Sequence, residues 1–307
     1  MNSPPLKLQA TILALALPTL MLRADDRRDF IVKGATIEKV ATGYQFTEGP
    51  AADRDGDIWF TDIPNSTIIR FDTSKQKAVV EHEDTEGANG LMFDRKNRLV
   101  ACAGGRREVV RYDHDGSQTI LAKNFGKKRF NSPNDLVLDG KGGFYFTDPA
   151  YFNTDDRDIE VEGVYYVDRE EQIIRVIDDM KRPNGLILSP DGRTLYVSDI
   201  GAKIIYAYHV NTDGTLADNR HFADADGGAD GMTVDEKGNL YAACSSGIQI
   251  WDPKGNELPT ITVPDRPANC AFGGPNHRTL YITARRSLYR IKLNVTGFER
   301  WKDQEHR

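Results

Sequence analysis

Residues 184–197 read NGLILSPDGRTLYV, and this stretch decides the fold. It begins with Asn184-Gly185 and a short apolar run, turns at Ser189-Pro190-Asp191-Gly192, and resumes with Leu195-Tyr196-Val197. Pro, Asp and Gly in this order favour a tight turn, while aliphatic and aromatic runs on both sides favour strands. The stretch is therefore predicted to be a β-hairpin that starts with a polar residue.

The same pattern occurs six times along the chain. Its six polar first residues are Glu48, Asn89, Asn134, Asn184, Asp230 and Asn269. They follow one another after 41, 45, 50, 46 and 39 residues, a spacing typical of four-stranded propeller blades. Further β-rich runs, such as residues 68–71 and 164–167, fill each interval. The sequence thus predicts an all-β protein, a six-bladed β-propeller with four antiparallel strands per blade.

The two ends of the repeat region complement each other. The last blade runs out of apolar residues after Leu293, while a β-rich run at residues 36–40 precedes the first blade and is not needed by it. We expect this N-terminal strand to complete the last blade and close the ring, which removes exposed strand edges. Residues 30–300 are then a single propeller domain, because a radial repeat accommodates this length in one domain.

The first 24 residues differ in composition from the rest. A mostly apolar run follows Lys7 and ends before the charged residues that begin at Asp25. The run is short for a membrane span and suits a signal peptide, so we expect an exported protein. Leu22 and Arg23 are not the small residues preferred at a cleavage site, which keeps an uncleaved N-terminal anchor open as the alternative.

Charge and composition restrict the partners of the chain. The 307 residues carry a net charge of −6, and 39% of them are hydrophobic. No long block of lysine or arginine is present, so a nucleic-acid partner is not expected. Apart from the N-terminal segment, no stretch could span a bilayer. An acidic protein hosts a cation more readily, and a metal ion is the partner that this composition favours.

The six polar first residues should form a ring, because the first strand of every blade lines the central channel. Polar residues at strand starts often only cap backbone groups, but this does not explain one Glu and one Asp among four Asn. Two carboxylates at one channel mouth repel each other unless a cation lies between them. Carboxylate and amide oxygens suit Ca²⁺, and histidine is absent from the ring. We predict one divalent cation, preferably Ca²⁺, with Mg²⁺, Mn²⁺ and Zn²⁺ as alternatives.

Four ring members should contact the ion, leaving two to face substrate or water. In a propeller, the loops between second and third strands lie on the same side as the ring, together with the linkers between blades. The linkers bring Arg129 there, and the loops bring Tyr151. We predict that both residues contact substrate. Residues 151–162 are the longest of these loops, and their composition fits either a lid or a solvated excursion. Three aspartates that end second strands are expected to cap turns: Asp62, Asp148 and Asp199.

Several motifs together resemble the regucalcin/gluconolactonase family, and the bacterial gluconolactonases in particular. They are Glu48-Gly49-Pro50, Ser132-Pro133-Asn134-Asp135, Arg182-Pro183-Asn184-Gly185-Leu186, Ser189-Pro190-Asp191-Gly192, Asp230-Gly231-Met232 and Phe272-Gly273-Gly274. The resemblance spans about residues 36–293 and implies a six-bladed propeller that hydrolyses sugar lactones with one axial divalent cation. Animal members carry an arginine for substrate where this chain has Ser132-Pro133.

Matching positions assign roles to the ring by this resemblance. Glu48, Asn134, Asn184 and Asp230 correspond to the metal ligands, and Asp230 also corresponds to the proton donor and acceptor. Asn89 and Asn269 are left to bind substrate or orient water. We therefore predict a metal-dependent hydrolase that opens a small-molecule sugar lactone. The alternatives are an aryl-ester or organophosphate hydrolase on the same site, and a non-catalytic binding propeller that the metal only stabilises.

Overall fold

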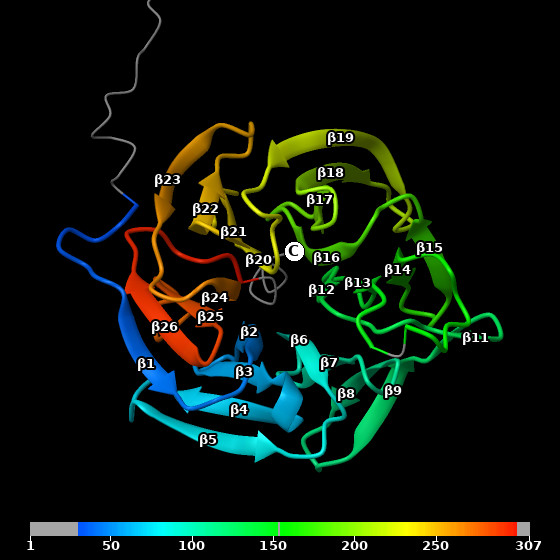
Figure 1. Cartoon of the computed structure of the whole chain (residues 1–307), viewed down its shortest axis with the longest axis horizontal. Coiled ribbons are helices and arrows are strands. Elements are labelled where there is room, and N and C mark those ends of the chain that lie inside the picture. The colour runs from blue at the N-terminus through cyan, green and yellow to red at the C-terminus, as the bar shows by residue number, and fades with distance from the viewer. Residues whose placement is uncertain (1–29, 153, 300–307) are drawn as a thin grey trace, which may run out of the picture.

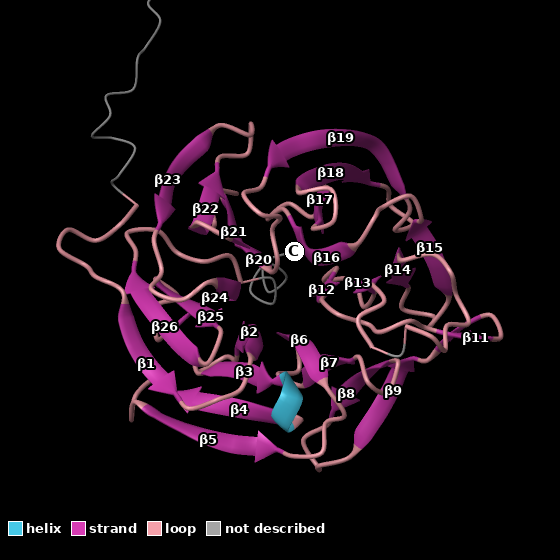
Figure 2. Ribbon diagram, in the orientation of Figure 1, coloured by secondary structure: helices cyan, strands magenta, loops and turns pink. Residues whose placement is uncertain are grey.

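Six antiparallel sheets of four strands stand around a central axis (Figure 1). The computed structural model describes residues 30–152 and 154–299. In each sheet the strand order runs from an innermost strand beside the axis to an outermost strand at the rim (Figure 1). The six-bladed propeller predicted from the repeats is therefore confirmed. The blades consist of strands. Figure 2 also shows a single-turn 3₁₀ helix at Ile63–Asn65.

The strands follow the repeat along the chain. The first three blades are β2 (Thr47–Ala52), β3 (Ile58–Asp62), β4 (Thr67–Asp72) and β5 (Lys77–His82); β6 (Ala88–Phe93), β7 (Leu99–Ala103), β8 (Glu108–Tyr112) and β9 (Gln118–Ala122); and β12 (Leu136–Leu138), β13 (Phe144–Asp148), β14 (Gly163–Val167) and β15 (Ile173–Ile177). A small hairpin of β10 (Asn124–Phe125) and β11 (Lys128–Arg129) lies between the second and third blades.

The remaining blades repeat the arrangement. They are β16 (Pro183–Leu188), β17 (Thr194–Asp199), β18 (Ile204–Val210) and β19 (Leu216–Asp224); β20 (Met232–Val234), β21 (Leu240–Cys244), β22 (Gly247–Trp251) and β23 (Glu257–Ile261); and β24 (Pro267–Gly273), β25 (Thr279–Ala284), β26 (Ser287–Lys292) and β1 (Glu38–Thr42). The last blade thus takes its outermost strand from the other end of the described chain.

This outermost strand closes the ring as expected. β1 pairs antiparallel with β26, with Glu38 opposite Arg290 and Thr42 opposite Ser287. The Arg290 guanidinium also lies 2.8 Å from the carboxylate of Glu38. The strand covers residues 38–42 rather than the predicted 36–40, a shift of two residues at each end. Closure between distant parts of the chain removes the free edge that the last blade would otherwise expose.

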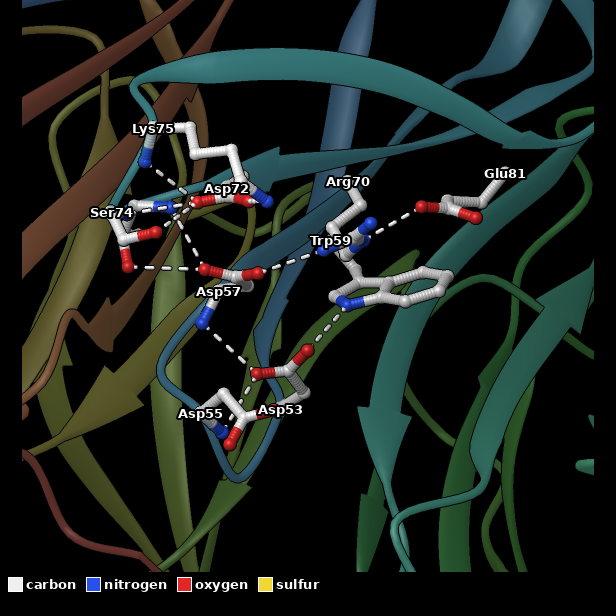
Figure 3. Close-up of polar contacts among 10 residues, drawn as sticks. Asp53, Asp55, Asp57, Trp59, Arg70, Asp72, Ser74, Lys75 and Glu81 are labelled. Atoms are coloured by element: carbon white, nitrogen blue, oxygen red, sulfur yellow. Dashed lines mark hydrogen bonds and ion pairs between the residues drawn. The ribbon is translucent and has the colours of Figure 1, made fainter.

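The turn between the first two strands of a blade is held by an aspartate, as the turn pattern indicated. In the first blade, Asp53 Oδ1 accepts the backbone N–H groups of Asp55 and Asp57, and its Oδ2 accepts the indole N–H of Trp59 (Figure 3). Asp57 continues the network to Arg70 (Figure 3). One carboxylate thus fixes both the turn and an aromatic side chain, which explains why these positions favour Asp.

The core lies between neighbouring blades. Strands β7, β13 and β21 are buried along their whole length, because both faces of each sheet pack against adjacent blades. Aromatic rings bridge these contacts: Trp59 packs edge-on against Phe93 of the next blade at 5.5 Å, and Phe71 contacts Tyr281 at 6.2 Å. Burial on both faces accounts for the continuous apolar runs in the sequence.

The predicted signal peptide or anchor at residues 1–24 lies outside the described residues. Within the described part of the chain, no helix has the length and apolar character needed to cross a membrane.

Candidate active site

The six polar residues that open the repeats all lie at the start of the innermost strands. In blades 1, 2, 4 and 6 the pairing with the second strand is interrupted there, for instance between Glu48 and Ala51 and between Pro183 and Leu186. In blades 3 and 5 the innermost strand begins only two residues later. Because a bulge re-aims side chains, the interruption frees these residues from the alternation of the sheet.

A glycine follows the ring residue in four blades, and its lack of a side chain lets neighbouring blades touch. A Cβ atom on Gly49 would overlap the carbonyl oxygen of Asn89, and one on Gly185 would overlap that of Asp230. The backbone N–H of Gly90 donates a hydrogen bond of 2.8 Å to the carbonyl oxygen of Asn134 in the next blade. The backbone N–H of Gly185 donates one of 3.1 Å to the carbonyl oxygen of Asp230. Close approach of backbones around the axis therefore requires glycine.

Five ring residues are buried, with 5–8% of their surface exposed: Glu48, Asn89, Asn134, Asn184 and Asn269. Asp230 is partly exposed, which makes it the ring carboxylate that solvent reaches. Among the described residues, the side chains of Asn89 and Asn134 have no hydrogen-bond partner, so their amide groups are available to a ligand. The ring thus combines one accessible carboxylate with uncommitted carboxamides.

Burial raises the pKa values of the ring carboxylates. The pKa of Glu48 is held well above its usual range, mainly by burial and further by the charges of Asp230 and Asp135. Burial raises the pKa of Asp230 to about 7, against the opposing effects of the Arg266 charge and a hydrogen bond from Asn184. Each group is therefore costly to ionise in the absence of a compensating positive charge.

Asp135 is a third carboxylate beside the ring, and our sequence analysis gave it no role. It stands where four other blades have glycine and the sixth has Cys270, is 9% exposed, and accepts the N–H of Leu136. The side chain of Asn269 lowers the pKa values of both Asp135 and Glu48, so polar groups of three blades influence one another in the channel. Burial raises the pKa of Asp135 to about 7. The replacement of glycine by an acidic residue in this single repeat was the signal that could have revealed it.

The loop that carries Tyr151 reaches the ring. The amide of Asn184 donates a hydrogen bond of 2.8 Å to the hydroxyl of Tyr151, and burial raises the pKa of that hydroxyl. Phe152 lies on the other side, in contact distance of Gly104 in the second blade. Tyr151 therefore reaches a ring residue of the fourth blade, while Phe152 reaches the second blade.

Arg129 lies farther out than Tyr151. It is exposed, and its guanidinium binds Asp156 and Asp158 of the same loop at 3.0 and 2.8 Å. Its contact with substrate stays a prediction. The loop has further anchors: Ile159 is buried in the core, and Arg107 donates a 2.6 Å hydrogen bond to the carbonyl of Asp156. The described part of residues 151–162 is thus attached to the blades rather than extended into solvent.

A cavity of about 140 Å³ lies in the channel behind the ring. Asp135 and Asn269 line its ring end, while Phe298 and Glu299 of the C-terminal segment line it from the far side. His277 Nε2 lies 3.2 Å from the carboxylate of Glu299, and both side chains are buried. The described C-terminal segment therefore lies at the end of the channel opposite the ring, beside the turns of the fifth and sixth blades.

Comparison with known proteins agrees with this geometry. Residues 46–286 match the SMP-30/Gluconolactonase/LRE-like region, which is most of the chain. The chain belongs to this family. The family member Gluconolactonase of Zymomonas mobilis is 32% identical to it over 304 residues, covering 88% of this chain and 85% of that protein.

Two further relatives show how widely the family resemblance extends. Regucalcin of Xenopus laevis is 27% identical over 258 residues, covering 80% of this chain and 85% of that protein. The solved structure of a gluconolactonase from Xanthomonas campestris superposes with a TM-score of 0.80 at 31% identity, covering 86% of this chain and 91% of that one.

The donor groups of this family member fit a hard divalent cation. Within the described residues, no group of three or more His, Cys, Asp or Glu converges as a metal site, so carboxamide oxygens must contribute to any coordination. Glu48 and Asp230 raise each other's cost of ionisation, and a cation between them would remove that cost. Oxygen-only donors favour Ca²⁺ or Mg²⁺ over Zn²⁺. Cys270 Sγ instead faces the carbonyl of Tyr241 at 3.8 Å.

The three aspartates at the ends of second strands cap the linkers between blades. Asp62 accepts the N–H groups of Gln45 and Phe46, Asp148 accepts that of Asn131, and Asp199 accepts those of Lys181, Arg182 and Ala202. The capping role expected from the sequence is confirmed. These residues build the frame that holds the linkers rather than the ring itself.

Asp148 differs in its degree of burial, and this leads to a testable pH effect. The residue is fully buried, its Oδ1 has no hydrogen-bond partner among the described residues, and burial raises its pKa to about 7. In the unfolded chain its pKa is about 3.9. Between these values the folded state holds a proton that the unfolded state has released, so its contribution to stability falls as pH rises from about 4 to about 7.

We expect Asp148→Asn to reduce the loss of stability between pH 5 and pH 8. The neutral amide keeps an acceptor for Asn131 and has no proton to lose. Thermal unfolding at fixed Ca²⁺ would show a smaller fall of Tm with pH in the variant than in the wild type, by a few degrees. Parallel Tm curves for the two proteins would contradict the assignment of this pH effect to Asp148.

Proposed function

We propose that the ring is the active site of a cation-dependent lactone hydrolase that opens sugar lactones. One observation carries this proposal: two buried or partly buried carboxylates, Glu48 and Asp230, share the ring with carboxamides in a member of a gluconolactonase family. The names of the gluconolactonase relatives support the substrate class. The site residues would be Glu48, Asn134, Asn184 and Asp230 around one divalent cation, preferably Ca²⁺.

The chain's own groups can carry the proton transfers. Asp230, which solvent reaches, takes a proton from the attacking water while the water oxygen bonds to the lactone carbonyl carbon. The bond from that carbon to the ring oxygen then breaks, and Asp230 returns the proton to this leaving oxygen. The products are a hydroxyl group and a carboxylic acid, which ionises at neutral pH. A bound cation would polarise the carbonyl group and stabilise its developing negative charge.

Other residues would position the substrate. The uncommitted amide groups of Asn89 and Asn134 lie beside the axis, where Asn89 can bind a sugar hydroxyl or orient water. Asn269 contributes differently, because its amide lowers the pKa values of Glu48 and Asp135 and so favours their ionised forms.

The test is hydrolysis of glucono-1,5-lactone by the purified chain, followed as acid release. We expect activity to vanish with a chelator and to return with Ca²⁺, because the cation held by the ring would bind the carbonyl oxygen of the lactone. Mg²⁺, Mn²⁺ and Zn²⁺ in separate samples identify the preferred ion. Phenyl acetate and an organophosphate test the alternative substrate classes. A cation-binding protein that hydrolyses none of these compounds would overturn the hydrolase proposal and leave a binding propeller.

A further inference from the structure

Tyr151 is the residue through which the loop after β13 touches the ring. We propose that Tyr151 is a positioning residue for the cation site, holding the amide of Asn184 so that its carbonyl oxygen faces the axis. The inference rests on the proposed function only in that it places a cation in the ring. It assigns to Tyr151 a role different from contact with substrate.

The hydrogen bond of Asn184 supports this orientation. Its Nδ2 atom donates to the hydroxyl of Tyr151 at 2.8 Å. The nitrogen and the oxygen are the two ends of the planar carboxamide, so an amide whose nitrogen is held at Tyr151 turns its carbonyl oxygen away from the phenol. The remaining carbonyl oxygen is the end that a cation prefers. Without the hydroxyl, the amide could rotate and present N–H groups to the ion, which would repel it.

The backbone of Tyr151 is itself anchored by a hydrogen bond. Ser132 Oγ accepts the backbone N–H of Tyr151 at 3.0 Å and donates to the carbonyl of Pro149 at 2.6 Å. Ser132 is buried and lies two residues before Asn134. The start of the loop is therefore fixed to the linker that leads into the ring.

The phenol ring of Tyr151 also contacts the linker that leads into the fourth blade. The Arg182 guanidinium lies over the ring of Tyr151 at 5.4 Å from its centre and pairs with Glu162 at 3.2 Å. Arg182 stands two residues before Asn184, so both ends of the loop attach to the linker of the fourth blade. The hydroxyl of Tyr151 consequently has a defined position relative to Asn184.

Residues that orient a metal ligand contribute measurably to metal affinity, typically by 10- to 100-fold. The test is calorimetric titration of Ca²⁺ into the full chain and into Tyr151→Phe, after removal of bound metal. We expect the Kd for Ca²⁺ to rise about 10-fold or more in the variant. We also expect kcat and KM for the lactone to return to near wild-type values when Ca²⁺ saturates the variant. The buried amide of Asn184 loses one hydrogen-bond acceptor in the variant, so the Tm of the metal-free protein should fall only slightly.

The matched control is Tyr206→Phe, the same chemical change on β18, where the hydroxyl makes no hydrogen bond to another described residue. Its Kd for Ca²⁺ should equal that of the wild type. An unchanged Kd in Tyr151→Phe would overturn the inference, as would a raised KM that persists at saturating Ca²⁺, because that pattern belongs to a substrate contact. Failure of the proposed function looks different: Ca²⁺ would bind with the expected Kd values, and no lactone would be hydrolysed. Absence of Ca²⁺ binding in the wild type would overturn the inference.

Discussion

Replacement of Asp230 by Asn is expected to lower the rate of lactone hydrolysis on the order of 10²- to 10⁴-fold, the range that proton transfer by a positioned side chain contributes. Asp230 is the partly exposed carboxylate of the ring, and with a cation bound beside it the ionised form would be favoured, as a group that accepts the proton of water requires. Asparagine has the same shape but cannot accept the proton of the attacking water. The measurement is kcat for glucono-1,5-lactone at saturating Ca²⁺, which separates lost proton transfer from weakened cation binding.

Asp226→Asn is the matched control for this variant. Asp226 is an exposed carboxylate four residues earlier, on the linker that leads to the same strand. Its replacement removes the same charge from the same side of the propeller, so a general effect of charge would appear in both variants. Substantial hydrolysis by Asp230→Asn at saturating Ca²⁺ would contradict the role of Asp230 as base and acid, whatever the effect on cation affinity.

The second large effect is expected from Gly231→Ala. A Cβ atom at this position would overlap the side chain of Asn269 in the next blade. Asn269 cannot easily move aside, because it is 6% exposed and its Oδ1 accepts the N–H of Cys270 at 2.8 Å. Overpacking of this kind costs about 1–3 kcal/mol in the free energy of unfolding, and occasionally more. Displacement of Asn269 would also disturb Glu48 and Asp135, so lactone hydrolysis should fall together with Tm.

Gly116→Ala separates crowding from loss of backbone freedom. Gly116 has a φ of +84° and no atom within 4 Å of an added Cβ, so its replacement costs only the strain of a left-handed residue, roughly 1–2 kcal/mol. It lies in a turn between Asp113 and Ser117, away from the ring, and hydrolysis should be unaffected. Wild-type stability and activity in Gly231→Ala would show that the innermost strands do not need this close approach.

The repeat pattern was sufficient to predict the propeller. Each repeat consists of a polar residue, an apolar run, a turn that contains Asp and a second apolar run. These signals are carried by residues close together in the sequence. Asp53 illustrates this, because its two oxygens bind partners at most six residues away. The ring positions followed from the same local pattern, since equivalent strands of a radial repeat begin at equivalent places around one axis. The closing strand was also predictable, although its bounds shifted by two residues.

The contacts that make the ring a site were not predictable in this way, because they join residues far apart in sequence. Asn269 lowers the pKa values of Glu48 and Asp135, which lie in two other blades. Tyr151 meets Asn184 across β14, β15 and a linker, which separate the two residues in the sequence. A repeat specifies where each strand starts, whereas the direction of each side chain depends on the bulge at that start and on the neighbouring blade. The strand pattern therefore revealed which residues surround the axis, and the packing of the blades established which of them hold one another in place.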